Sequence, residues 1–157
     1  MKPMVFLISG LLGALVLSAC SQQEPPSEVP YGYVAFIIDT AITGSDNSLR
    51  DGMTGNARHY SATQPSALSP LGAYGYCGVI VVRAYDNRLY AFDSCCPYEH
   101  RKDTEVALDG YFAVCPTCGS SFEIGNGSAR PNKGPATARL KCYRVSDYGN
   151  ERYRISN

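Results

Sequence analysis

The sequence has no surplus of charge of either sign and no cluster of basic residues. Fourteen Lys and Arg residues balance fourteen Asp and Glu residues, so the formal net charge is zero. Proteins that bind nucleic acid through its phosphates carry a basic patch or stripe. The sequence therefore does not favour a nucleic-acid partner.

Long apolar runs are missing after the first twenty residues, and so is a long apolar pattern of helical period. The first absence argues against a membrane-spanning helix in the rest of the chain, because such a helix needs about 20 apolar residues. The second absence, together with twelve Tyr and fifteen Gly, favours β structure. The length is that of one domain able to bury a core.

Groups typical of hydrolytic catalysis are missing as well. The only two histidines are His59 and His100. Neither combines with Ser and Asp into a plausible nucleophilic set, and no pair of carboxylates suggests acid–base work. His59 stands in a polar stretch and is expected to be solvated. The sequence therefore predicts an electron carrier or a non-catalytic module rather than an enzyme.

The first twenty residues indicate export. Lys2 precedes an uncharged, mostly apolar run over 5–17, which is too short to span a membrane permanently and is typical of a signal peptide. Leu17-Ser18-Ala19-Cys20 resembles the lipobox of bacterial lipoproteins, in which the cysteine receives acyl chains such as palmitate. The resemblance implies a signal peptide at 1–19 and a lipid on Cys20. An ordinary signal peptide with a chance cysteine is the alternative.

Residues 20–30 are polar and rich in proline, so they predict a flexible tether between the lipid and one β domain at 31–157. Two or more acyl chains would anchor the chain stably in a membrane. Ser21 stands where an aspartate would resemble an inner-membrane retention signal. We therefore expect a position in the bacterial cell envelope, on the outer membrane and facing the periplasm.

Short β-prone segments follow one another closely after residue 30. Asp86-Asn87 and Asn126-Gly127 are turn signals between such segments. Residues 45–70, rich in Gly, Asn, Ser and Ala, predict a long surface loop. The pattern predicts an all-β antiparallel sandwich or barrel with strands at 31–38, 79–84, 88–93, 111–114, 121–124, 140–145 and 152–155.

Six cysteines follow Cys20, at positions 77, 95, 96, 115, 118 and 142. An exported protein can keep disulfides, so three bridges are open, as is a four-thiolate metal site with one bridge. Cys77 and Cys142 flank strands at the two ends of the domain, and we predict a disulfide between them. Two separate buried thiols are the alternative.

The four central cysteines lie in two segments that each follow an expected strand. In Cys115-Pro116-Thr117-Cys118-Gly119, proline fixes one φ and glycine permits a tight return, which is the shape of a metal knuckle. A facing loop with Cys96 would add a third thiolate. The predicted fourth ligand is His100, with Cys95 and Tyr98 as alternatives. In an extended segment Cys95 would point away from Cys96.

The spacing of these two loops resembles that of Rieske [2Fe-2S] domains. Residues 115–120 resemble the Cys-Pro-x-His-Gly-Ser segment of that family, with Cys118 where histidine belongs. Gly134-Pro135-Ala136 resembles the family's proline loop. The likeness covers about 75–146, and it resembles in particular the Rieske-fold lipoproteins of Bacteroidetes. It implies an all-β, Rieske-like fold with a small two-loop subdomain of the cluster-binding type.

The ligand set departs from the family, because Tyr98 and Cys118 stand where the two histidines belong. A Rieske centre has one iron on two thiolates and the other on two imidazoles, which this chain cannot supply. The resemblance implies a [2Fe-2S] cluster with altered ligands, electron transfer to a redox partner protein docking over the loops, and a Ser120 hydroxyl that bonds a cluster sulfur.

Other chemistries of the same residues stay open. Zinc suits three thiolates and an imidazole. A disulfide from Cys115 to Cys96 or Cys95 would join the loops without metal, and Cys115 with Cys118 could form a redox-active dithiol. In the second function that we consider, the domain has lost its cluster. It would then be a disulfide- or zinc-stabilised interaction module.

Overall fold

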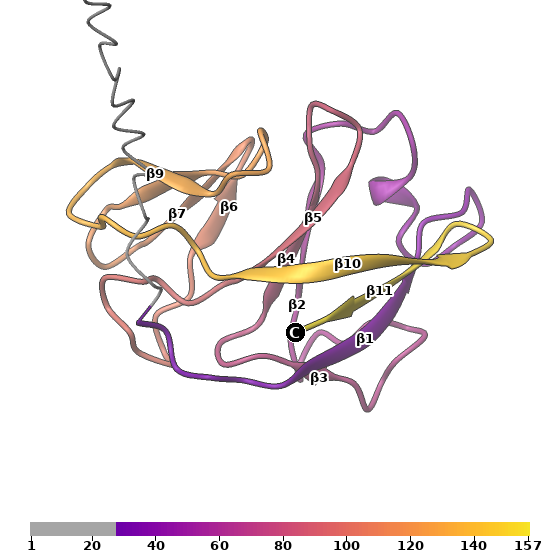
Figure 1. Cartoon of the computed structure of the whole chain (residues 1–157), viewed down its shortest axis with the longest axis horizontal. Helices are drawn as coiled ribbons and strands as arrows, with labels where there is room; N and C mark the ends of the chain where they lie inside the picture. Colours follow the sequence, from indigo (N-terminus) through magenta and orange to yellow (C-terminus); the bar gives the residue numbers. More distant parts are fainter. Residues whose placement is uncertain (1–27) are drawn as a thin grey trace, which may run out of the picture.

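The computed structural model describes residues 28–157, and this part of the chain is all-β (Figure 1). Its only helical element is one 3-10 turn, η1 (Asn47–Leu49). No helix within residues 28–157 is long and apolar enough to cross a membrane. The predicted fold class is confirmed. The strands are β1 (Val34–Asp39), β2 (Ala57–Tyr60), β3 (Ala73–Tyr74), β4 (Val79–Arg83), β5 (Leu89–Asp93), β6 (Ala107–Asp109), β7 (Phe112–Val114), β8 (Ser121–Glu123), β9 (Arg130–Lys133), β10 (Cys142–Gly149) and β11 (Arg152–Ser156).

The strands form two antiparallel sheets. The larger sheet has the order β2-β4-β5-β10-β11-β1-β3, and the smaller has the order β6-β7-β8-β9. In Figure 1 the smaller sheet stands at one end of the larger. The segment 94–106 leads from β5 to β6 and so from one sheet to the other, while the turn 115–120 joins β7 to β8. The smaller sheet is therefore the predicted small two-loop subdomain.

The hairpin of β4 and β5 divides the interior into two cores. Its register pairs Val79 with Asp93 at one end and Arg83 with Leu89 at the other. Successive side chains of a strand point to opposite faces. Val79 and Val81 therefore enter one core, with β1 and β11, while Ile80 and Val82 enter a second core with the smaller sheet. Burying each such side chain contributes roughly 1.5–3 kcal/mol.

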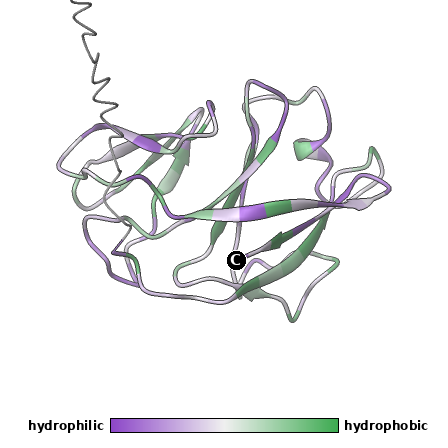
Figure 2. Ribbon diagram, in the orientation of Figure 1, coloured by the Kyte–Doolittle hydropathy of each residue, from purple (hydrophilic) through white to green (hydrophobic). Residues whose placement is uncertain are grey.

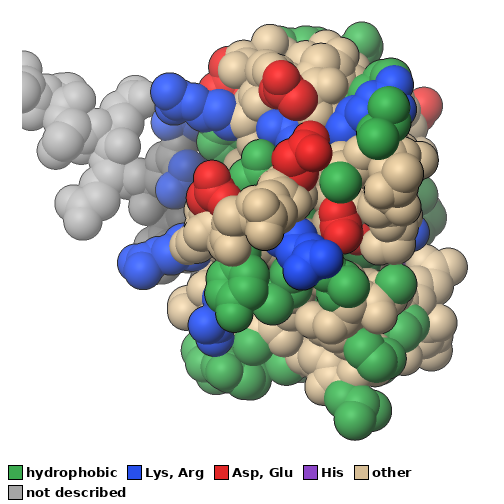
Figure 3. Space-filling view, turned by 90° about the vertical axis from the view of Figure 1, so that its right-hand side faces the viewer, with side chains coloured by type: hydrophobic (Ala, Val, Ile, Leu, Met, Phe, Trp, Pro, Cys, Tyr) green, Lys and Arg blue, Asp and Glu red, His purple; other side chains and the backbone are tan. Residues whose placement is uncertain are grey.

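Hydropathy follows burial along the strands. In Figure 2 hydrophobic residues dominate β1, whose side chains alternate between buried and half-buried. Hydrophilic residues interrupt β10, most of which is exposed or half-buried. Figure 3 shows the face at the right-hand side of Figure 1, where basic and acidic side chains are intermixed. This mixture agrees with the zero net charge and forms no single-sign patch on that face.

The predicted loop over 45–70 is partly wrong. It contains β2, which pairs with β4 in the register Ala57↔Val82 to Tyr60↔Val79, and it contains η1. Leu49 and Tyr60 are fully buried. The sequence does not indicate this strand because Ala57, Arg58 and His59 are not β-prone residues. All three are half-buried, and only Tyr60 is buried. The predicted strands also omit the short strands β3, β6 and β9.

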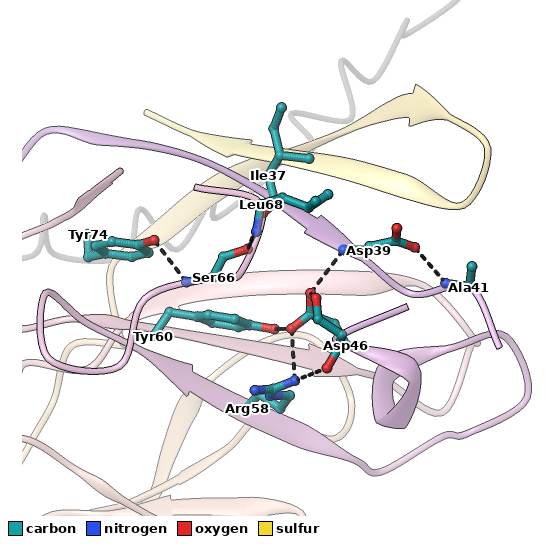
Figure 4. Close-up of polar contacts among 10 residues, drawn as sticks. Ile37, Asp39, Ala41, Asp46, Arg58, Tyr60, Ser66, Leu68 and Tyr74 are labelled. Carbon is teal, nitrogen blue, oxygen red and sulfur yellow. Dashed lines mark hydrogen bonds and ion pairs between the residues drawn. The ribbon is translucent and has the colours of Figure 1, made fainter. Parts of the chain in front are cut away.

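Asp46 is a buried carboxylate that ties this segment to the larger sheet (Figure 4). Its Oδ1 accepts hydrogen bonds from the Tyr60 hydroxyl and from Arg58 Nη1, each at 2.8 Å. Its Oδ2 accepts from the Asp39 backbone N–H at 2.9 Å and from the Ser45 hydroxyl at 2.8 Å. Burial, followed by the Asp46 charge, raises the pKa of the Tyr60 phenol. Asp46 therefore holds together β1, β2 and the segment between them.

Replacing Asp46 by alanine tests this network. We expect Asp46→Ala to lower the free energy of unfolding by about 3 kcal/mol, because the buried Tyr60 hydroxyl and the Arg58 charge lose their partner. Urea unfolding followed by circular dichroism measures the change. The control is Asp109→Ala on the exposed strand β6, which should change stability by about 0.5 kcal/mol or less. Equal effects of the two substitutions would contradict the assignment.

Candidate metal centre

Three thiols from the two loops meet in the second core. Cys96 belongs to the segment after β5, whereas Cys115 and Cys118 belong to the turn between β7 and β8. Cys96 Sγ lies 3.7 Å from Cys118 Sγ, and all three sulfur atoms lie within 4.8 Å of one another. Cys96 and Cys115 are buried, while Cys118 is half-buried. We call these residues the three-thiol site.

The turn of the second loop is built as the sequence predicts. The Cys115 N–H donates to the Ser120 carbonyl oxygen at 2.8 Å, and the Gly119 N–H donates to the Cys115 carbonyl oxygen at 3.0 Å. Gly119 has φ +73°, a conformation that glycine adopts at little cost. Ser120 Oγ lies 3.1 Å from Cys118 Sγ and accepts from the Ala136 N–H at 3.0 Å. The Cys118 thiol donates to this same oxygen, and once Cys118 is ionised the Ser120 hydroxyl donates to the thiolate instead.

A glycine lets a third segment close over this turn. Gly134 has φ +91°, and a Cβ there would lie 2.4 Å from the Ser120 Cα. No larger residue fits such a close approach. The segment Gly134-Pro135-Ala136, expected from its resemblance to a proline loop, thus covers Ser120 and fixes the side chain that bonds Cys118.

The first loop separates its two adjacent cysteines. Cys96 points into the three-thiol site, whereas Cys95 points the other way and lies with Cys77 and Asp93. This is the outcome that alternation along an extended segment predicts. Cys95 is therefore held in a different cluster and does not join the site as a fourth ligand.

The other two candidates for a fourth ligand also lie elsewhere. The loop curls as expected, since the His100 N–H donates to the Cys96 carbonyl oxygen at 3.0 Å. The imidazole turns outward, however, and its Nε2 lies 3.4 Å from Glu28 Oε2. Tyr98 is exposed. Among the His, Cys, Asp and Glu side chains of residues 28–157, none joins the three thiols as a fourth.

Cys77 has a different thiol neighbour from the one that we predict. Its sulfur lies within 4.8 Å of Cys95 Sγ and of an Asp93 carboxylate oxygen. Cys142 is exposed on β10, with its Sγ 3.7 Å from the Leu140 carbonyl oxygen. In the described part of the chain no disulfide joins Cys77 to Cys142. The physical reason is the strand register, which sets Cys77 opposite the first loop.

The sequence analysis did not predict that the His59 and Glu105 side chains pack against the first loop. His59 Nε2 lies 3.1 Å from Ser94 Oγ and 3.4 Å from Glu105 Oε2. His59 is thus not simply solvated; it supports the first loop from β2. Only recognition of β2 as a strand could have placed His59 beside the first loop, and the sequence does not indicate that strand.

The thiols of the site differ in acidity. Burial raises the pKa of Cys96 to about 12, against the opposing effect of backbone N–H groups of Tyr98 and Glu99. For Cys118, burial also opposes ionisation, but hydrogen bonds from the Ser120 hydroxyl and backbone outweigh it and lower the pKa. Cys118 therefore ionises before Cys96, and it is also the most exposed of the three thiols.

The spacing of the sulfur atoms suits one metal ion. With metal–sulfur bonds near 2.3 Å, two thiolates on a tetrahedral zinc stand about 3.8 Å apart, close to the 3.7 Å between Cys96 and Cys118. Soft thiolate ligands select thiophilic metals. The donor set does not fit a Rieske cluster, which requires two imidazoles, since His59 contacts Ser94 and His100 contacts Glu28.

No family model and no curated protein matches this chain. Solved structures give distant similarities. One is a chain of the complex of reduced oxygenase and oxidized ferredoxin in carbazole 1,9a-dioxygenase, with 20% identity and a TM-score of 0.45 over 78% of this chain and 93% of that chain. Another is the Sphingomonas yanoikuyae B1 ferredoxin, with 23% identity and a TM-score of 0.36 over 51% of this chain and 74% of that chain. Because both TM-scores are below 0.5, function has to be argued from the thiols themselves.

Thiol alkylation tests the assigned acidity. In metal-free protein at neutral pH we expect iodoacetamide to modify Cys118 about tenfold faster than Cys96, because the thiolate is the nucleophile. The rate should rise with pH from below the ordinary thiol range. Mass spectrometry of the digested protein measures it. Ser120→Ala removes the hydroxyl and should slow alkylation of Cys118; an unchanged rate in that variant would contradict the role of Ser120.

Proposed function

We propose that this protein is a membrane-anchored, Rieske-like interaction module in which Cys96, Cys115 and Cys118 bind one thiophilic metal ion. The observation that carries the proposal is the meeting of three thiols from two loops within 4.8 Å. In a two-iron cluster, thiolates on different irons are farther apart than thiolates on one metal ion, because the iron–iron distance adds to the two iron–sulfur bonds. Three thiols this close therefore favour a single ion over a cluster.

A metal at this site would cross-link the two sheets. Cys96 continues from β5 of the larger sheet, and Cys115 follows β7 of the smaller sheet. Both thiols pack in the core that Ile80 and Phe122 share. Zinc in such a site adds its binding free energy to the stability of the fold. The role of these residues is then to hold the two loops in one arrangement that a partner can recognise.

The tether would bring this end of the domain toward the anchor. The lipid site at Cys20 and most of the expected tether, 20–30, lie outside the described residues. The described chain begins beside the first loop, where Glu28 faces His100 and Val29 is buried near Cys77. Residues 28–30, at the end of the expected tether, contact the domain. We infer that the two loops stand at the tethered end, in the bacterial cell envelope.

The second candidate function is electron transfer through a [2Fe-2S] cluster with altered ligands. A specific feature favours it, because the Ser120 hydroxyl beside a loop sulfur and the cover from Gly134 match the arrangement that the Rieske resemblance implies. A cluster would need a fourth ligand from outside the three-thiol site, and a redox partner docking over the loops.

Metal content and colour separate the two candidates. We expect the full chain, purified without oxygen, to be colourless and to hold about one zinc per chain. Cys118→Ser should lose that metal, whereas Cys142→Ser, which changes an exposed thiol on β10, should keep it. Visible absorption bands with about two irons and two sulfides per chain would establish the second candidate. A metal-free protein would overturn both.

The anchor is tested independently of the metal. We expect the full chain expressed in a bacterium with a lipoprotein pathway to incorporate labelled palmitate and to sediment with the outer-membrane fraction. Cys20→Ser should abolish both, while Cys142→Ser should change neither. Labelling or membrane recovery that survives Cys20→Ser would contradict a lipid on Cys20.

A further inference from the structure

A second thiol pair lies on the opposite side of the first loop from the three-thiol site. Cys77 comes just before β4, and Cys95 comes just after β5. Both are buried, and their sulfur atoms lie within 4.8 Å of each other. Each thiol also donates to the same carbonyl oxygen, that of Arg101, at 3.4 and 3.5 Å. Cys77 and Cys95 take no part in metal binding at the three-thiol site.

The end of the β4–β5 hairpin brings these two cysteines together. The register of the hairpin ends at Val79↔Asp93, and beyond it the Ser94 N–H still donates to the Gly78 carbonyl oxygen at 3.0 Å. Cys77 and Cys95 are the next residues on the two chain segments, and their sulfur atoms lie within 4.8 Å of each other. Forming the S–S bond of about 2.0 Å from this separation requires rotation of the two side chains.

We propose that Cys77 and Cys95 form a cross-strand disulfide when the protein meets a disulfide oxidant. The Cys77 thiolate attacks one sulfur of the oxidant, whose other half leaves as a thiolate. Cys95 then attacks the Cys77 sulfur of the mixed disulfide, and the second half of the oxidant leaves. Two electrons and the two cysteine protons thus pass to the oxidant, which ends as two thiols.

A pocket gives the oxidant a route to Cys77. The pocket has a volume of about 300 Å³, and Cys77, Lys102 and Glu105 are among its lining residues. Cys77 keeps a small exposed fraction, 7%, whereas Cys95 has none. Cys77 is therefore the thiol that the oxidant reaches first, and Cys95 is the one that resolves the mixed disulfide.

The hydrogen bonds of the Asp93 carboxylate disfavour a metal ion at this second pair. Its Oδ2 accepts from the Tyr143 hydroxyl at 2.5 Å and from the Tyr76 N–H at 3.3 Å, and its Oδ1 accepts from the Cys95 N–H at 2.8 Å. Both oxygens are thus engaged in fixing the backbone around the two cysteines. The two groups of this cluster that are left to react are the Cys77 and Cys95 thiols, and two neighbouring thiols can form a disulfide.

Disulfide mapping tests the proposal on the full chain. The protein is treated with oxidised glutathione at mildly alkaline pH, its remaining thiols are blocked with iodoacetamide, and it is digested with trypsin. We expect residues 59–83 to be recovered covalently joined to 89–101. Mild alkali is chosen because the hydrogen bond to Cys95, and then burial, raise the pKa of the Cys77 thiol.

Variants assign the bond, because Cys95 and Cys96 share one tryptic fragment. The join should persist in Cys96→Ser and in Cys142→Ser, and it should vanish in Cys95→Ser. Reduction of the oxidised protein should lower its melting temperature by about 10 °C. A join from Cys77 to the fragment with Cys142, full alkylation of Cys77 after oxidation, or zinc retained by Cys77 and Cys95 in Cys118→Ser would each overturn the proposal.

The two proposals fail separately. Metal binding at the three-thiol site is read from metal content in Cys77→Ser, where the second pair is broken and Cys96, Cys115 and Cys118 remain. The disulfide is read in Cys118→Ser, where the three-thiol site is broken and the second pair remains. A negative result in one variant leaves the other result standing.

Discussion

The antiparallel pairing of β4 with β5 is the constraint on which the rest of the structure depends. Its backbone hydrogen bonds fix the register from Val79↔Asp93 to Arg83↔Leu89, and the register decides which core each side chain enters. The alternation does not stop where the strands end. It carries on into the first loop, where Cys95 turns to one side and Cys96 to the other. One hairpin thus supplies a thiol to each of two separate clusters.

The three-thiol site is positioned by residues that do not themselves belong to the site. The Gly119 turn and the cover from Gly134 fix the second loop, while His59 and Glu105 support the first from below. The sulfur atoms therefore meet through backbone geometry from two different sheets. With no imidazole among its ligands, a metal bound here would lack the group that gives a Rieske centre its titration near neutral pH.

Many features were open to prediction because they depend on neighbours in sequence. The turn at Asp86-Asn87, the strand over 79–83 and the knuckle around Cys118 each follow from a few adjacent residues. The strand β2 was missed because only pairing with β4 makes Ala57-Arg58-His59-Tyr60 a strand. The buried carboxylate of Asp46 was missed for the same reason, since all its partners but Ser45 are distant in the chain.

The sequence by itself determined the all-β class, the two cysteine loops and the choice of Cys96, Cys115 and Cys118 as the central thiols. These depend on short β-prone segments, on turn signals and on the local conformations of Pro and Gly, which act over a few residues. Only the tertiary structure decided that His100 faces Glu28 instead of the site, and that Cys77 lies beside Cys95 instead of Cys142. Both outcomes depend on strand register and on chain segments far apart in sequence, which local patterns do not encode.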